Sequence, residues 1–155
     1  MFGLFKASPF TDPQFGQLIR TQGLWRGSIA LPGHAPVPLL LAGNRQAPAA
    51  AALDAVRQLD VVWPAWRADI EAALYEHYEP YGDAEPSAAQ SPTPVITTPG
   101  QVWEHAELQY IAVSPMNGGL TVELGYTVAW DEEHTLGARF QEGRLLELNG
   151  SVLPP

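Results

Sequence analysis

Residues 130–137 carry more chemically capable side chains than any other stretch of this chain. They read Trp-Asp-Glu-Glu-His-Thr-Leu-Gly, so three carboxylates and one histidine occupy four consecutive positions. Such groups perform general acid–base catalysis and also bind zinc, manganese or non-haem iron. A Glu-His dipeptide recurs at Glu76-His77 and at Glu104-His105, so three of the four histidines directly follow a glutamate.

A metal site is the first hypothesis for these residues. Its donors would be His105 and His134, together with Asp131, Glu104 or Glu133. Their spacing matches neither the His-Glu-x-x-His pattern nor the calcium-loop pattern. The sequence therefore gives no basis for assigning a metal or any other cofactor.

General acid–base catalysis is the second hypothesis, with Glu133 and His134 in those roles and Glu104 and His105 as a further pair. Adjacent side chains on an extended strand point to opposite faces, so a Glu-His dipeptide is not a ready-made catalytic pair. The chain also contains no nucleophile elbow, no P-loop and no dinucleotide-binding fingerprint. A metal-dependent or acid–base enzyme of hydrolase type, which uses this Glu/His cluster, is therefore the alternative interpretation.

Protein binding is the leading interpretation. The acidic stretch Asp131, Glu132, Glu133 and His134 can complement a basic partner, and tyrosines such as Tyr78 and Tyr81 are favoured anchors at interfaces. A purely structural role is also consistent with the residue types. In that case Asp131 caps a turn, His134 bonds a neighbouring strand and Gly137 supplies a positive φ angle.

The residues before this stretch predict the strand that positions it. In 119–130, apolar and polar side chains alternate, which is typical of a half-buried strand that ends in a loop at Asp131. Further strands are predicted at 106–114, 136–141 and 144–148. Hairpin turns are expected at Asn117-Gly118 and Glu142-Gly143. This register places Glu104-His105 near the stretch from Glu132 to His134.

The first half of the chain predicts strands at 15–20, 24–31 and 37–42. A helix should begin at Pro48. Pro64 interrupts its apolar spacing, which indicates either a kink or a second helix that begins near Trp63 and ends before Pro80. The second helix would carry Trp66, Ile70, Ala73, Leu74 and His77 on roughly one face. Residues 82–99 are rich in Ala, Ser, Pro and Thr and predict a flexible internal linker. The chain is thus expected to be one α+β domain, residues 1–155, with a mainly antiparallel sheet of six or seven strands and two inserted helices.

Composition limits the classes of partner. The chain has 155 residues, no cysteine and a formal net charge of −9, and its eight lysines and arginines are scattered along the sequence. Nucleic acid and anionic membranes are therefore poor partners, whereas a basic protein is a suitable one. The start resembles no signal peptide, and no apolar stretch is long enough to span a bilayer, so we expect a cytoplasmic protein.

The strand ending in Trp130-Asp131-Glu132-Glu133-His134, followed by Gly137, resembles a group of uncharacterised small bacterial domains. The similarity extends to Trp25-Arg26-Gly27, to the aliphatic residues 39–41 and to the helix end at 74–78. These domains are similar to immunity-like proteins of bacterial polymorphic toxin systems. The family has no settled activity, so the resemblance implies no particular chemistry.

Overall fold

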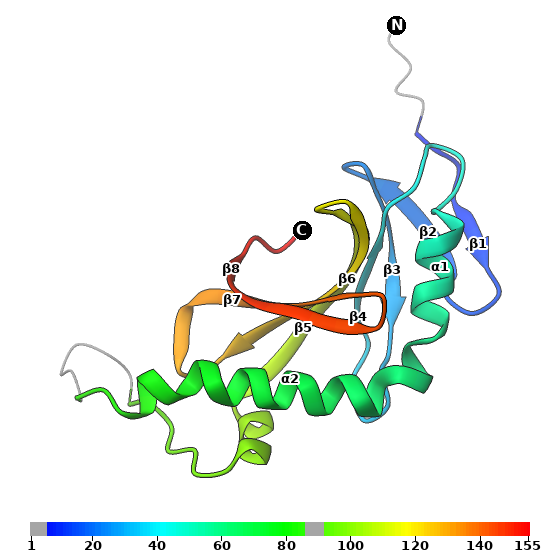
Figure 1. The fold of residues 1–155 in the computed structure, drawn as a ribbon. Helices are drawn as coiled ribbons and strands as arrows, with labels where there is room; N and C mark the ends of the chain where they lie inside the picture. The colour runs from blue at the N-terminus through cyan, green and yellow to red at the C-terminus, as the bar shows by residue number, and fades with distance from the viewer. Residues whose placement is uncertain (1–5, 86–91) are drawn as a thin grey trace, which may run out of the picture.

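The computed structural model describes residues 6–85 and 92–155. It contains one curved eight-stranded sheet whose strands are ordered as in the sequence, β1 to β8 (Figure 1). The strands are β1 (Phe10–Asp12), β2 (Gly16–Thr21), β3 (Leu24–Ile29), β4 (Val37–Leu41), β5 (Ala106–Met116), β6 (Gly119–Val128), β7 (Asp131–Gln141) and β8 (Arg144–Val152). The helices are α1 (Ala50–Arg57), α2 (Leu59–Gly82) and the short 3₁₀ helix η1 (Pro99–Glu104).

The sheet is antiparallel except where β4 pairs with β5 in parallel, after the chain has crossed over through α1 and α2. The predicted α+β class with a mainly antiparallel sheet is therefore confirmed. The number of strands was underestimated, because β1 has three residues and is too short to show an alternating pattern. No helix within the described residues is both long and apolar enough to cross a bilayer.

Helix α2 is longer than the sequence predicts. It begins at Leu59, includes Pro64 and Pro80, and ends at Gly82. A proline removes one helical hydrogen bond and frees the carbonyl group four residues before it. Both prolines are exposed, as are Asp60 and Glu76 at those earlier positions. Water can therefore bond the freed carbonyl groups, and the helix continues through both prolines.

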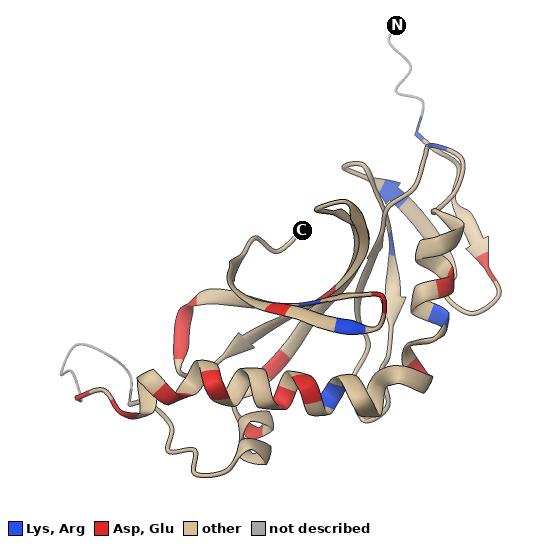
Figure 2. Ribbon diagram, viewed as in Figure 1, with Lys and Arg blue, Asp and Glu red and all other residues tan. Residues whose placement is uncertain are grey.

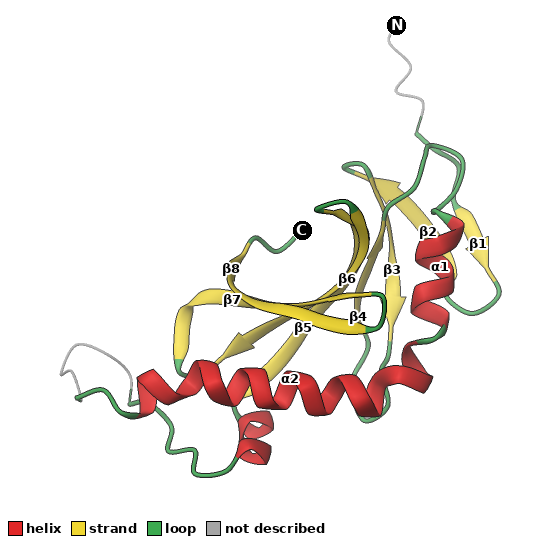
Figure 3. Ribbon diagram, in the orientation of Figure 1, coloured by secondary structure: helices red, strands yellow, loops and turns green. Residues whose placement is uncertain are grey.

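One apolar stripe of α2 packs against the sheet and forms the main core. Its buried residues are Leu59, Trp63, Trp66, Ile70, Leu74 and Tyr78. The Trp66 ring stacks on Phe140 of β7 at 3.9 Å between ring centroids. Figure 3 shows the strands curving above α2, with the C-terminus on the other side of the sheet. Burying this stripe fixes the rotation of α2 and so determines which of its polar residues face β7.

The predicted turns at Asn117-Gly118 and Glu142-Gly143 are confirmed, since all four residues have positive φ angles. The predicted linker at 82–99 is only partly described, because residues 86–91 lie outside the described part of the chain. Beyond them, the Tyr78 hydroxyl donates to the Pro94 carbonyl group (2.8 Å) and accepts from the Ile96 amide (3.1 Å). Ile96 is itself buried, so this part of the linker is anchored to α2.

Candidate functional site

The acidic stretch lies where the β6–β7 hairpin meets the C-terminal half of α2. Strand β6 ends at Val128, Ala129 and Trp130 form the turn, and Asp131 already pairs with Val128 as the first residue of β7. Residues 131–134 therefore belong to a strand, and the prediction of a loop there was wrong. The chain reverses two residues earlier than the alternating pattern suggests, because Trp130 continues the apolar alternation through the turn.

Asp131 is the centre of a hydrogen-bonded group that joins helix and hairpin. Its carboxylate accepts a bond from the Tyr81 hydroxyl (2.9 Å) and one from the Glu133 amide (3.3 Å). Nδ1 of His134 lies 2.9 and 3.0 Å from its two oxygens. Burial alone would raise the pKa of Asp131, but the bonds from His134 and Tyr81 outweigh it and lower the pKa.

A second contact joins the same two elements. Trp130 Nε1 donates to Nδ1 of His77 on α2 (3.0 Å), so this nitrogen is unprotonated. Burial lowers the pKa of His77, which keeps the imidazole neutral and able to accept this bond. The His77 ring stacks on Tyr81 at 5.5 Å, and Tyr78 packs edge-on against Trp130 at 5.5 Å.

These residues define the helix–hairpin cluster: His77, Tyr81, Trp130, Asp131 and His134. The sequence interpretation selected Tyr81, Asp131 and His134 but gave His77 no role. The i,i+4 spacing of His77 and Tyr81 could have identified it, because that spacing places both side chains on one helix face. Chemically, Asp131 orients the imidazole of His134 through Nδ1, while the half-exposed ring leaves Nε2 available for another group.

Two other candidates have different environments from those expected. Tyr78 is 6% exposed and bonds the segment 94–96, so it is a core residue and not a surface anchor. Gly137 has no positive φ angle. A side chain there would instead approach Val152 to 2.6 Å, so glycine is needed for close packing between β7 and β8.

Glu104 and His105 lie at the same end of the sheet as the acidic stretch. The His105 carbonyl group accepts a hydrogen bond from the amide of Ala129 (2.9 Å), immediately before Trp130. The predicted location at one end of the sheet is therefore confirmed, with β6 lying between β5 and β7. Within residues 6–85 and 92–155, however, no three His, Asp or Glu side chains are grouped so as to bind a metal ion.

Exposed carboxylates surround the helix–hairpin cluster, and we call five of them the acidic surface. They are Glu76, Glu79, Asp83, Glu132 and Glu133. None forms a salt bridge with another described residue. Figure 2 shows acidic segments along the C-terminal half of α2 and at the adjacent start of β7.

Acidic and basic residues are unevenly distributed along the chain. Residues 1–58 contain five lysines and arginines and two aspartates, whereas residues 59–133 contain thirteen acidic residues and one arginine. In the fold, the first group lies around β1–β3 and α1, at the far end from the acidic surface (Figure 2). The five lysines and arginines of this N-terminal group therefore lie away from the acidic surface (Figure 2).

Residues 14–152 match the model of a protein family described as a domain of unknown function, DUF6985. The chain belongs to this family. The matched residues include strands β2 to β8. They also include the complete helix–hairpin cluster. No curated protein and no solved structure shows a significant match to the chain.

Proposed function

We propose that this DUF6985 domain is a non-enzymatic protein-binding domain whose acidic surface receives a basic segment of a partner protein. The observation that carries the proposal is the set of exposed, unpaired carboxylates from two elements, α2 and β7, on one surface. Clustered charge of one sign attracts a partner of opposite charge and orients it as the two approach.

The cluster beneath the acidic surface supports this role. Hydrogen bonds from Tyr81 to Asp131 and from Trp130 to His77 fix β7 to α2, so the carboxylates are held by rigid elements. A preorganised surface loses less conformational entropy when a partner binds. The resemblance to immunity-like proteins makes a toxin with a basic surface the partner class that we favour.

The alternative is an acid–base enzyme that uses the Asp131–His134 pair. The orientation of His134 by a carboxylate favours it, because this is how an imidazole is prepared to exchange a proton. The hollow formed by the β3–β4 loop, α2, η1 and β5, however, is not lined by His134. Binding therefore accounts better for the surroundings of the cluster.

Zero-length cross-linking of carboxylates to lysines in the native lysate tests the proposal. We expect cross-links from Glu76, Glu79, Glu132 and Glu133 to lysines of one basic protein. The exposed acids Asp54 and Glu142, outside the acidic surface, provide the matched control. Cross-links spread equally over both sets, or reaching many unrelated proteins, would contradict the proposal.

A further inference from the structure

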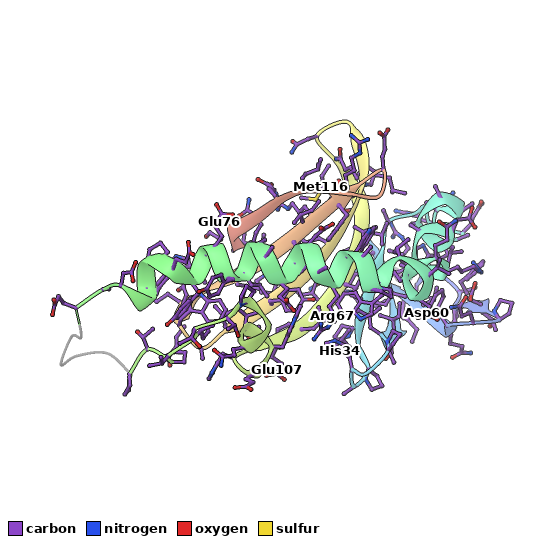
Figure 4. All side chains as sticks on the ribbon, turned by 60° about the horizontal axis from the view of Figure 1, so that its bottom comes forward. His34, Asp60, Arg67, Glu76, Glu107 and Met116 are labelled. Atoms are coloured by element: carbon purple, nitrogen blue, oxygen red, sulfur yellow. The ribbon has the colours of Figure 1, made fainter. Side chains whose placement is uncertain are left out.

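A groove lies on the side of α2 that faces away from Glu76 of the acidic surface (Figure 4), and it has no role in the proposed function. It has a volume of about 630 Å³ and is lined by the β3–β4 loop, Arg67 of α2, Trp103 of η1 and residues 106–109 of β5. This volume lies within the range of roughly 300–1,000 Å³ that is usual for ligand pockets. In Figure 4, His34 and Glu107 lie on the same side of α2 as Arg67.

The groove lies where the parallel strands β4 and β5 separate, and we call this place the fork. Strand β4 pairs with β5 only from Leu39 opposite Ile111 to Leu41 opposite Val113. No backbone hydrogen bond joins residues 30–36 to residues 106–110 in the described part of the chain. The first residues of β5 therefore have β6 on one side and the groove on the other.

The register identifies which backbone groups face the groove. The amide of Ala129 donates to the carbonyl group of His105, and Glu107 lies opposite Thr127 two residues further along. Hydrogen-bonded and non-bonded pairs alternate along antiparallel strands. Glu107 thus bonds β6, whereas the N–H and C=O groups of Ala106 and Leu108 point into the fork. A free strand edge of this kind is a template for an added strand.

The side chains that line the groove include one cation, Arg67, next to an aromatic ring and several prolines. Arg67 is the only lysine or arginine between Arg57 and Arg139. Its guanidinium carbon lies 4.7 Å from the centre of the Trp103 ring, its side chain is 46% exposed, and its contact with Glu71 is a long one of 3.5 Å. Guanidinium nitrogens are therefore available to a carboxylate, beside an indole and the prolines of the β3–β4 loop.

A buried tyrosine next to Leu108 and Trp103, Tyr126, also lacks a hydrogen-bond partner. Its hydroxyl group is fully buried and has no partner among the described residues. Its ring lies 6.0 Å from that of Trp103, and the residue is directly opposite Leu108 in the sheet. Buried polar groups are normally bonded, so the chain by itself leaves polar groups unmatched at this place.

We infer that this fork is a peptide-binding site, separate from the acidic surface. Its ligand is a short extended peptide that pairs with the backbone of Ala106 and Leu108 and places an acidic side chain against Arg67. The unpaired edge accounts for the extended backbone of the ligand, and the exposed guanidinium group of Arg67 accounts for its carboxylate. His34 lies beside Trp63 (5.5 Å between rings), and burial and the charge of Arg67 lower its pKa, so it adds no second cation.

The test is an NMR titration of the ¹⁵N-labelled full chain with a pool of acetylated, amidated pentapeptides of sequence X-Val-Glu-Val-X. We expect the amide signals of Ala106 and Leu108 to shift and their hydrogen exchange to slow. A matched pool with Gln in place of Glu should bind about fivefold more weakly, because it lacks the charged contact with Arg67. A pool with N-methylated valines should lose at least about tenfold in affinity, because it cannot pair with the strand edge.

Variants separate the two parts of the site. Arg67→Gln should weaken binding of the Glu pool about fivefold, whereas Glu107→Gln and the matched surface control Arg144→Gln should not weaken it. The double variant Glu132→Gln/Glu133→Gln should also not weaken it, so the result is independent of the acidic surface.

Four outcomes would overturn the inference. They are no shift at millimolar peptide, equal binding of the N-methylated pool, an unchanged affinity of Arg67→Gln, and shifts of the same size with sodium acetate alone. The last outcome would identify a site for small carboxylates.

Discussion

The Tyr81 hydroxyl of α2 lies 2.9 Å from Oδ2 of Asp131, the first residue of β7. These residues are fifty positions apart in the sequence. Their bond connects the end of the long helix to the beginning of the strand that carries Glu132 and Glu133. The position of the acidic surface therefore depends on a contact between two residues that do not belong to that surface.

Removal of the Tyr81 hydroxyl should weaken this connection without changing the fold. We expect Tyr81→Phe to lower the free energy of unfolding by ~0.5–1.5 kcal/mol, the usual effect of losing one hydrogen bond. Urea denaturation measures this change. The matched control is Tyr75→Phe, whose hydroxyl makes a long, exposed contact of 3.4 Å with Thr97 and should change stability much less. Equal losses in the two variants would show that the Tyr81–Asp131 bond has no special role.

The stabilising effect of Asp131 should depend on pH. Its pKa is lowered in the folded protein, so at acidic pH this carboxyl group binds fewer protons in the folded protein than in the unfolded chain. The contribution is complete above the unfolded pKa of about 3.9 and is lost as the pH falls through the lower folded value.

The variant Asp131→Asn should therefore be less stable than the wild type by ~1–2 kcal/mol near neutral pH, with a gap that narrows below about pH 4. Urea denaturation at several pH values checks this expectation. Asp12, whose pKa is also lowered, is present in both proteins and cancels in the comparison. A gap that stays constant down to the lowest accessible pH would refute this role of Asp131.

Protonation of His77 should break its bond with Trp130. Its pKa lies below the ordinary value of about 6.5, because burial disfavours the charged imidazole. For a base with a lowered pKa, the stabilising contribution is complete above about 6.5 and falls as the pH decreases toward the folded value.

In ¹⁵N NMR spectra, the indole Nε1–H signal of Trp130 should consequently titrate with a midpoint below pH 6.5 and should stop titrating in His77→Gln. The indole of Trp103, which donates to Glu71 (2.6 Å), serves as an internal reference for the titration. A Trp130 signal that titrates unchanged in His77→Gln would show that another group is responsible.

Gly125 should not tolerate a side chain. A Cβ atom at this position would overlap the ring of Tyr110, whose hydroxyl donates to the buried Glu123 (2.7 Å). Overpacking of this kind costs ~1–3 kcal/mol, so Gly125→Ala should lower the midpoint of urea unfolding. The same substitution in a Tyr110→Ala background should cost clearly less. If both backgrounds lose the same stability, the ring of Tyr110 is not the cause.

Neutral residues in place of Glu132 and Glu133 should slow association with the basic partner and reduce its dependence on salt, while leaving stability nearly unchanged. Asp131 is kept in this variant, because it is a buried partner of Tyr81 and its loss would disturb the fold. The control Asp54→Asn/Glu142→Gln removes the same charge elsewhere. Stopped-flow association rates at several salt concentrations measure the effect, and identical rates for the two double variants would argue against electrostatic docking.

Much of the local structure followed from the sequence. Alternating residues predicted β6, the Asn117-Gly118 and Glu142-Gly143 turns predicted two hairpins, and the apolar spacing in α2 predicted the stripe of Trp66, Ile70 and Leu74. These features depend on neighbours within a few positions, which a sequence pattern records directly. The hairpin register also predicted that His105 and the acidic stretch share one end of the sheet.

Other features depended on contacts between distant residues. Trp130 fitted the strand pattern but lies in the β6–β7 turn, where its indole N–H donates to the His77 ring fifty-three positions away. Pro64 was expected at a kink or near the start of a second helix, but α2 begins five residues earlier, at Leu59. The helix includes Pro64 because this proline faces solvent while Trp63 and Trp66 pack in the core.

The sequence by itself therefore determined the α+β class, the hairpins and the excess of negative charge. Tertiary structure decided which charges gather on one surface, which tyrosine is buried and which histidine is joined to Asp131. The physical reason is that burial of the apolar stripe of α2 sets its rotation against β7. That rotation brings residues from separate segments together in a way that no spacing within one segment records.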